Sequence, residues 1–341
     1  MKKPTPEQIK EAASKITNYF GGYFAIWTID LGLRKGLFAE IAKHPQGISS
    51  KSLAKKLNFD HLYIDVWCRN AYGAELLEIK DESYVLPLNL ATLLLDRDSP
   101  FYVSGTAQAL VGLRDVFVSL RSWIKTGKHI WWDSTPREFV DAVAESSRPF
   151  YSRLLNFVEN NSNLKDRLTN KETLLEVGVG YGTGLIRFAQ KYPRAKFIGV
   201  DGDSYSLKQA KANFTKTKLA DRVRFVKSTF EDLSLSEVAD IALINISLHE
   251  ARDKKQAVKA MYKALKRGGV ILVSEFPYPE TPEGLKTPPA RVMSGVQYFE
   301  AAINDQLMPT KQFVNLLSAV GFQNIEIFEL APVHIVILGY K

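Results

Sequence analysis

A run of alternating glycines, Glu-Val-Gly-Val-Gly-Tyr-Gly-Thr-Gly over residues 176–184, is the strongest chemical signal in the sequence. Such glycines let the backbone approach a ligand closely and adopt positive φ, while the helix that follows offers its free N-terminal amides. A dinucleotide fingerprint reads Gly-x-Gly-x-x-Gly. That register fails here, because Thr183 stands at the last position counted from Gly178 and Leu185 at the last position counted from Gly180. No phosphate-loop Gly-Lys-Ser/Thr is present either.

A carboxylate follows this turn at the distance that a nucleoside pocket requires. Asp201 ends the apolar run Phe197–Val200, about twenty residues beyond the turn, and can accept hydrogen bonds from both hydroxyls of a ribose. The alternative is that Asp201 caps the next helix, but Asp203 and Ser204 are better placed for that role. The turn and Asp201 together therefore predict a nucleoside-cofactor pocket.

His249 and Glu275 are the candidates for acid–base chemistry. His249 lies just past the apolar run Ile241–Ile244, and an imidazole that titrates near neutrality can remove a proton from an acceptor hydroxyl. Glu275 ends the run Val270–Ser274 and would orient that imidazole and stabilise its protonated form. By position alone a lone histidine such as His249 is more often structural.

The elements that must position these residues form a recognisable pattern. Short apolar runs alternate with segments of helical periodicity from about residue 171 onward, which indicates a parallel sheet covered by helices on both faces. The runs are Thr173–Val177, Phe197–Val200, Val223–Val226, Ile241–Ile244 and Val270–Val273, followed by a helix over Gln312–Val320 and closing strands over Ile325–Phe328 and His334–Leu338. We expect an α/β, doubly wound Rossmann-like fold of seven strands, which binds ligands at the carboxyl ends of the strands.

The N-terminal third differs in pattern. Apolar residues at helical spacing over Glu7–Ala42 predict amphipathic helices around a break at Gly21-Gly22, with a face that needs a partner surface. A short helix capped by Ser49 or Ser50, a helix over His61–Leu77 and a hairpin over Ile79–Leu86 complete a winged-helix pattern. The second helix offers only Arg69 and Asn70 as good readers of DNA bases, so a mainly α dimerisation module is favoured over DNA binding.

A helical stretch over about Ser99–Arg167 is rich in aromatic residues. These residues either pack domains together or form a wall of an acceptor pocket, with Trp131-Trp132-Asp133 as part of a closing loop and Arg148, Phe150 and Tyr151 as further candidates. The domain boundaries that follow are 1–105 for the winged-helix-like region, 106–167 for the helical connector and 168–341 for the cofactor-binding domain.

The composition is typical of an ordinary globular protein. The net charge of +8 comes from 45 basic and 37 acidic residues interspersed along the chain, without the basic block typical of nucleic-acid or membrane surfaces. One cysteine excludes an internal disulfide, and the N-terminal segment lacks the apolar core of a secretory signal. We expect a cytoplasmic protein with no nucleic-acid or membrane partner. No His/Cys pair or carboxylate cluster has metal-ligand spacing, so no metal is expected.

The glycine turn followed by Asp201 resembles the cofactor motif of class I methyltransferases that depend on S-adenosylmethionine (SAM). Nearly the full chain is similar to the small-molecule O-methyltransferases of the caffeate, hydroxyindole and phenazine type, in which a winged-helix region dimerises. The resemblance implies that Gly178, Gly180 and Gly182 face the methionyl part of SAM, that Glu176 orients its amino group and that Asp201 binds the ribose. Thr229, Phe230 and Asn245 join this cofactor set, with Phe230 packing against adenine.

The same resemblance implies a methyl transfer to a small-molecule hydroxyl with His249 as general base and Glu275 beside it. Tyr151, Met293 and Phe299 are the candidates for the acceptor pocket. The family's second flanking glutamate aligns with Gln312, and the usual acid before Phe230 is absent. Loss of that second carboxylate leaves open an S- or N-methyltransferase acting mainly by alignment. A DNA-binding regulator with a nucleoside-sensing domain and a nicotinamide-dependent oxidoreductase are the rival classes.

Overall fold

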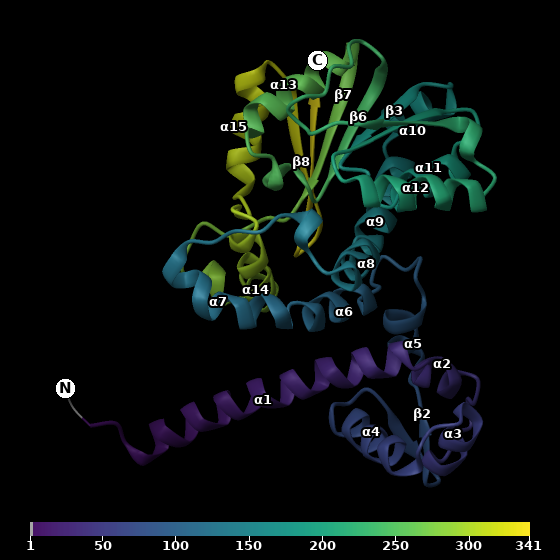
Figure 1. Ribbon diagram of the computed structural model, residues 1–341, viewed down its shortest axis with the longest axis vertical. Helices are drawn as coiled ribbons and strands as arrows, with labels where there is room; N and C mark the ends of the chain where they lie inside the picture. The colour runs from purple at the N-terminus through teal and green to yellow at the C-terminus, as the bar shows by residue number, and fades with distance from the viewer. Residues whose placement is uncertain (1–2) are drawn as a thin grey trace. The chain divides into compact units, whose positions relative to one another are not determined.

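The computed structural model describes residues 3–341, which divide into two compact units, one ending at Arg114 and one beginning at Asp115. Figure 1 shows the elements of both units along the chain. The boundary lies within the segment predicted as a connector, because the helix over Ser104–Gly112 belongs to the first unit and the helices after it to the second.

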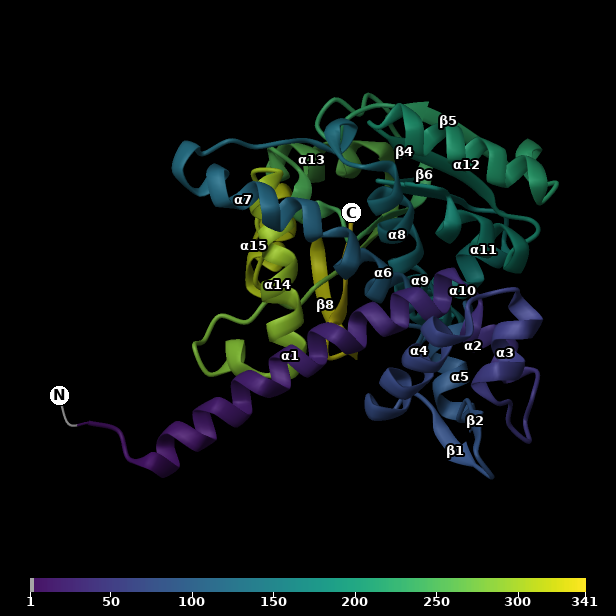
Figure 2. The same cartoon turned by 60° about the horizontal axis from the view of Figure 1, so that its bottom comes forward.

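The first unit contains six helices and a small hairpin in its described part, as Figure 2 shows from a second side. Ser49 caps the third helix by accepting a hydrogen bond from the Ser52 amide, in agreement with the sequence prediction. The predicted order of helix, helix and hairpin after Gly47 is also present. The elements are α1 (Pro6–Arg34), α2 (Leu37–Ala42), α3 (Ser50–Leu57), α4 (His61–Gly73), β1 (Glu78–Lys80), β2 (Ser83–Val85), α5 (Leu88–Leu95) and α6 (Ser104–Gly112).

The predicted break at Gly21-Gly22 is wrong, because α1 runs without interruption through both glycines. A glycine inside a helix costs only about 1 kcal/mol relative to alanine, which a helix of 29 residues can absorb. The helix also begins with a full capping box, in which the Thr5 and Gln8 side chains each accept the other residue's backbone amide.

The second unit is built on a seven-stranded sheet of order β5-β4-β3-β6-β7-β9-β8. Strands β3 to β7 are parallel, and β9 pairs antiparallel with both β7 and β8. All seven predicted strands are present, and each contains its predicted run; β7 and β8 extend well beyond theirs, to eleven and nine residues. They are β3 (Thr173–Val177), β4 (Lys196–Asp201), β5 (Val223–Lys227), β6 (Ala239–Asn245), β7 (Leu265–Glu275), β8 (Gln323–Ala331) and β9 (His334–Tyr340).

Helices cover both faces of this sheet, which confirms the predicted Rossmann-like arrangement (Figure 1). One core joins α13 and α15 to alternate strand residues such as Val177 and Ile244, and the other joins α9 to α12 to Leu174 and Leu243. The helices of this unit are α7 (Arg114–Thr126), α8 (Arg137–Ser146), α9 (Arg148–Asn160), α10 (Ser162–Thr169), α11 (Thr183–Lys191), α12 (Ser204–Lys216), α13 (Lys254–Ala264), α14 (Pro288–Ala302) and α15 (Thr310–Val320).

The strand order reverses at β3, with β4 on one side and β6 on the other. Loops after β3 and β6 therefore diverge and leave a crevice at the carboxyl ends of the strands. Within residues 3–341, no helix combines the length and apolar character needed to cross a bilayer.

Gly184, in the first turn of α11, is the tightest glycine of the loop region, because a Cβ there would lie 2.1 Å from the Tyr151 ring. We expect Gly184→Ala to destabilise the second unit by about 1–3 kcal/mol through overpacking. Gly295→Ala in α14, where nothing lies within 4 Å of the added Cβ, is the control and should be neutral or stabilising by about 0.5–1 kcal/mol. Thermal unfolding of both variants measures this difference, and equal midpoints would contradict the packing assignment.

Candidate active site

The glycine loop after β3 adopts the backbone that its sequence predicts. Gly178, Gly180 and Gly182 have φ of 76°, 52° and 73°, values that residues with a Cβ rarely adopt. The Gly178 and Val179 amides both donate to the Val200 carbonyl at 2.9 Å, which ties the loop to β4. Nothing lies within 4 Å of a Cβ built on Gly180, so its backbone faces open space.

Asp201 closes the same corner from the end of β4. Its Oδ2 accepts the Gly180 amide at 2.8 Å and its Oδ1 accepts the Asp203 amide at 2.9 Å. Burial raises the pKa of Asp201 to about 6, although these backbone hydrogen bonds act in the opposite direction. Asp203 caps α12 through the Ser206 amide, as predicted, so Asp201 has no capping role.

Glu176 is a fully buried carboxylate beneath the loop. The Tyr151 hydroxyl donates to its Oε1 at 2.6 Å, while its Oε2 has no hydrogen-bond partner among the described residues. Burial raises the pKa of Glu176 to about 8, despite the Tyr151 hydrogen bond, and the charge of Asp201 adds to the increase. Tyr151 was a sequence candidate for acceptor binding, but its hydroxyl is bound to Glu176 beneath the glycine loop.

Asn245, at the end of β6, is oriented by a chain of buried hydrogen bonds that the sequence did not reveal. Arg153 Nε donates to His334 Nδ1 at 3.0 Å, and His334 Nε2 lies 2.7 Å from the Ser274 hydroxyl. Ser274 donates to Asn245 Oδ1 at 2.6 Å. Because a guanidinium can only donate, His334 must carry its proton on Nε2, and every bond of the chain points toward Asn245.

This series of hydrogen bonds ends at the amide nitrogen of Asn245, which is left as a free donor. Asn245 Nδ2 is buried and has no hydrogen-bond partner within residues 3–341. Burial, together with the charge of Arg153, lowers the pKa of His334 to about 3, so the imidazole stays neutral. The sequence offers little signal for these partners, since Ser274 and His334 stand at the ends of apolar runs and Arg153 lies on α9.

A cavity of about 440 Å³ is lined by Asp201, Asn245 and Tyr151 together with aromatic residues of the middle stretch, and the buried Glu176 is not among its lining residues. Phe230 lines it and lies against Gly178, 3.4 Å from a Cβ built there. Thr229 also lines it and donates from its hydroxyl to Asp232 at 2.8 Å. The wall that contains the aromatic residues comprises Trp131, Trp132, Phe150, Phe276, Glu250 and Arg252.

His249 lies behind that wall and is 1% exposed. Its Nδ1 is 2.9 Å from both carboxylate oxygens of Glu275, and Glu275 Oε1 also accepts the Leu248 and His249 amides. Burial alone would lower the pKa of His249, but the charge and hydrogen bond of Glu275 and the charge of Glu300 outweigh it and raise the pKa to about 10.

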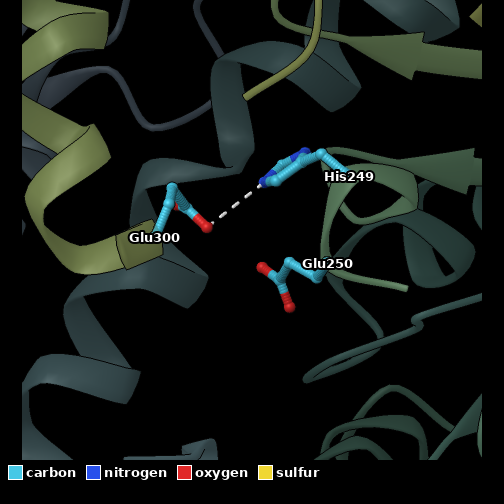
Figure 3. A group of neighbouring side chains, drawn as sticks. All are labelled: His249, Glu250 and Glu300. Atoms are coloured by element: carbon cyan, nitrogen blue, oxygen red, sulfur yellow. Dashed lines mark ion pairs between the residues drawn. The ribbon is translucent and has the colours of Figure 1, made fainter. Parts of the chain in front are cut away.

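The second carboxylate beside His249 is Glu300, so the expectation that Gln312 occupies this place is wrong. Glu300 Oε2 lies 3.7 Å from His249 Nε2, whereas Gln312 is exposed on α15. The error arose because Glu300 lies on a helix whose position in space cannot be read from residue spacing. Figure 3 shows Glu300 from α14 facing His249 and Glu250, which lie next to each other in the turn after β6.

The tertiary structure also forms a possible ligand set that sequence spacing did not predict. One nitrogen of His249 and one oxygen each of Glu250 and Glu300 lie within 4.8 Å of one another. A metal ion there would compete with the proton on His249 Nε2, since a histidine ligand must be neutral. A pKa of about 10 favours the proton at neutral pH.

Met293 and Phe299, the other acceptor candidates, are buried in α14 and are not among the residues that line this cavity. Phe299 packs edge-on against Trp132, with ring centroids 5.0 Å apart, and thereby supports the cavity wall. Met293 packs with Ala290 and Leu307 in a separate small core.

Comparison with known proteins identifies this unit. A protein-family model described as "Methyltransferase domain" matches residues 168–314. Those residues form a methyltransferase domain. The match begins just before β3 and therefore includes the glycine loop, Asp201, Asn245 and His249.

Curated relatives of the methyltransferase domain share only this part of the chain. The carboxy-S-adenosyl-L-methionine synthase of Nautilia profundicola is 28% identical over 149 residues, 43% of this chain and 62% of the relative. The malonyl-[acyl-carrier protein] O-methyltransferase of Priestia megaterium is 28% identical over 137 residues, 40% of this chain and 46% of the relative. The matched stretch thus spans about half of these relatives.

Solved structures resemble the whole chain in fold. An O-methyltransferase family protein from Burkholderia thailandensis has a TM-score of 0.73 at 14% identity, covering 96% of this chain and 98% of its own. Human N-acetylserotonin methyltransferase in complex with SAM has a TM-score of 0.69 at 18% identity, covering 97% of both chains. At these identities the likeness concerns the fold alone.

The domain match supports SAM as the cofactor of the methyltransferase domain. The polar groups around the cavity fit it. Glu176 Oε2 is an unpartnered acceptor for an ammonium group, and Asn245 Nδ2 is an unpartnered donor for a carboxylate. Open space at Gly180, with Asp201 behind it, leaves room for a ribose.

The two DNA-reading candidates of α4 are engaged within their own helix. Arg69 forms an ion pair with Asp65 at 2.7 Å, and the Asn70 amide donates to the Val66 carbonyl at 2.9 Å. Both contacts occupy the groups that would read base edges. They give no support to the regulator hypothesis.

The raised pKa of Glu176 generates a prediction about cofactor-site binding. S-adenosylhomocysteine carries a cationic amino group, which needs an ionised Glu176, whereas the free protein holds Glu176 mostly protonated at pH 7 because its pKa is about 8. Binding should therefore release up to about one proton at pH 7, and affinity should increase from pH 6 to pH 8. Calorimetry in buffers of different ionisation enthalpy measures both effects. Glu176→Gln should abolish the proton release and Glu280→Gln, on the exposed segment after β7, should retain it; wild-type binding without proton release would contradict the assignment.

Proposed function

We propose that this protein is a SAM-dependent methyltransferase that transfers a methyl group to a hydroxyl oxygen of a small molecule. The observation that carries the proposal is a single cavity. Asp201, Asn245 and Tyr151, whose hydroxyl holds the buried Glu176, line its one end, and aromatic residues and Glu250 line its other end. A small aromatic acceptor fits the second end while the first end holds the cofactor.

Each residue at the end of the cavity that would hold the cofactor has a distinct role in this proposal. Glu176 holds the amino group through its free oxygen, and the cavity-lining Tyr151 fixes the other oxygen of this carboxylate. Asn245 donates to the carboxylate of the methionyl part, and Asp201 accepts from the ribose hydroxyls. When bound, SAM supplies a methyl carbon on a positively charged sulfur. The residues around it fix its position relative to the acceptor.

The acceptor end combines apolar walls with proton-accepting groups. Trp132 and Phe276 exclude water, and Arg252 stacks over Trp131 with its guanidinium carbon 4.5 Å from the ring centroid. The cluster formed by His249, Glu250, Glu275 and Glu300, in which the sequence placed His249 as general base, takes up the proton that the hydroxyl loses.

S- or N-methylation by alignment is the second candidate, and one observation favours it. His249 is a cation at neutral pH because its pKa is about 10, so it is not a free base in this state. A thiol, thioether or amine acceptor needs little help from a base once its lone pair faces the methyl carbon.

One assay separates these functions. The protein is incubated with SAM labelled in the methyl group and with phenols (caffeate, N-acetylserotonin, 2-naphthol), a thioether (methionine methyl ester) and an amine (tyramine). We expect label on a phenol oxygen, because Glu250 and the aromatic walls suit a flat hydroxyl compound. If only the thioether or the amine nitrogen is labelled, the proposed function is S- or N-methylation and not O-methylation. Lack of binding to S-adenosylhomocysteine would exclude a methyltransferase altogether.

We also propose that the chain forms a homodimer through α1. Ile16, Phe20 and Phe24 lie four residues apart on one stripe of this helix, and their exposed fractions are 49%, 61% and 61%. A contiguous apolar stripe of this kind is typical of an interaction surface. A second copy of the same stripe is the occupant proposed here.

The dimer proposal predicts a change in mass on one substitution. Phe20→Glu should convert a dimer into a monomer, because it places a charge in the buried stripe. Leu88→Glu, at an exposed apolar residue of α5, should leave the dimer intact. Light scattering after size-exclusion chromatography measures the mass of each. A wild-type mass of one chain would contradict the proposal.

A further inference from the structure

We propose that Glu250, and not His249, is the group that touches the acceptor hydroxyl and takes its proton. The inference rests on the proposed O-methylation and names the residue that performs its proton transfer. Its starting point is access: Glu250 lines the cavity, whereas His249 is 1% exposed and is not among the lining residues.

Both nitrogens of His249 already face carboxylates. Nδ1 lies 2.9 Å from each oxygen of Glu275, and Nε2 lies 3.7 Å from Glu300 Oε2 (Figure 3). Glu275 itself is fixed by the Leu248 and His249 amides. An imidazole enclosed in this way holds its proton and acts as a fixed positive charge behind Glu250.

A hydrogen bond to one carboxylate oxygen holds Glu250 in place, and the other oxygen has no hydrogen-bond partner among the described residues. Its Oε2 accepts the Trp132 indole proton at 2.8 Å, and Oε1 accepts no hydrogen bond from the described residues. Trp132 also lines the cavity. The same hydrogen bond thus orients the carboxylate and closes the wall beside it, so that Oε1 remains for the acceptor.

Burial and the neighbouring charges raise the pKa of Glu250, which makes it a stronger base than an ordinary carboxylate. Burial and the charge of Glu300 raise its pKa to about 8, while His249 and the Trp132 hydrogen bond oppose this. A base with a pKa near 8 is better matched to a phenol than an ordinary carboxylate. The charged groups that face this cluster are His249 from the turn after β6, Glu275 from β7, Glu300 from α14, Asp305 after α14 with Lys254 of α13 bound to it, and Arg252 on the cavity wall.

The step balances without a further reagent. The acceptor oxygen forms a bond to the methyl carbon, the bond from that carbon to the sulfonium sulfur breaks, and its electron pair stays on sulfur. The hydroxyl proton moves to Glu250 Oε1 and leaves to solvent when the products depart. The charge of His249 lowers the free energy of the ionised Glu250 before this transfer.

The test uses the full chain with caffeate, N-acetylserotonin or 2-naphthol, whichever is methylated. In the wild type, kcat should rise with pH through about 8, because Glu250 must be ionised. Glu250→Gln retains an oxygen for Trp132 but no base, so kcat should fall by about 10²–10³ and the pH rise should vanish. Glu250→Asp should restore part of kcat together with the pH rise. Glu280→Gln is the control for removal of a carboxylate.

Two further readouts separate chemistry from structure and from the proposed function. Affinity for S-adenosylhomocysteine should stay within about threefold in Glu250→Gln, and its loss would show a merely structural role. Infrared titration of the wild type minus that of Glu250→Gln should leave one carboxyl group that loses its proton near pH 8, since Glu176 titrates in both proteins. Ionisation of that group below pH 6 would overturn the proposal. A Glu250→Gln enzyme with near-normal kcat, or with an unchanged pH rise, would also overturn it. If S-adenosylhomocysteine binds but no phenol is methylated, the proposed O-methylation itself has failed.

Discussion

The hydrogen bond from the Gly180 amide to Asp201 is the interaction on which the site depends. It joins the loop after β3 to the end of β4, two neighbouring parallel strands whose register pairs Glu176 with Gly199. Parallel pairing brings the carboxyl ends of adjacent strands to one edge, so Asp201 and Asn245 line the same cavity, and Glu176 lies buried beside it against the cavity-lining Tyr151. The positive φ values of the loop glycines allow the chain to turn away without a side chain entering this space.

The two ends of the cavity differ in how their buried polar groups are held. At the cofactor end, single partners such as Tyr151 and Ser274 each fix one atom and leave the other free, which is how Glu176 and Asn245 present Oε2 and Nδ2. A buried polar atom without a partner is costly unless a ligand completes it. The free atoms are therefore best understood as the contacts that a bound molecule would satisfy.

At the acceptor end, carboxylates share a small buried volume with one imidazole. Burial together with the like charges of neighbouring carboxylates raises the pKa to about 8 for Glu250 and to about 7 for Glu300. Burial is the first cause in both residues. The imidazole of His249 offsets part of the repulsion, and its own pKa increases to about 10 in return. Proton affinity is thus a property of the cluster, distributed by geometry over its members.

The sequence by itself determined the sheet, the glycine loop and Asp201, because hydrophobic periodicity and glycine spacing report on the local backbone. It also placed Ser49 and Asp203 as helix caps correctly. It failed at Gly21-Gly22, since a long capped helix tolerates glycine, and at Gln312, since Glu300 reaches His249 only through the packing of α14. Contacts between distant segments create the series of hydrogen bonds that runs from Arg153 through His334 and Ser274 to Asn245. They also place Glu250, and not His249, on the cavity wall. Only the tertiary structure decided them, because side chains far apart in sequence acquire their neighbours, and hence their charge state, when the core packs.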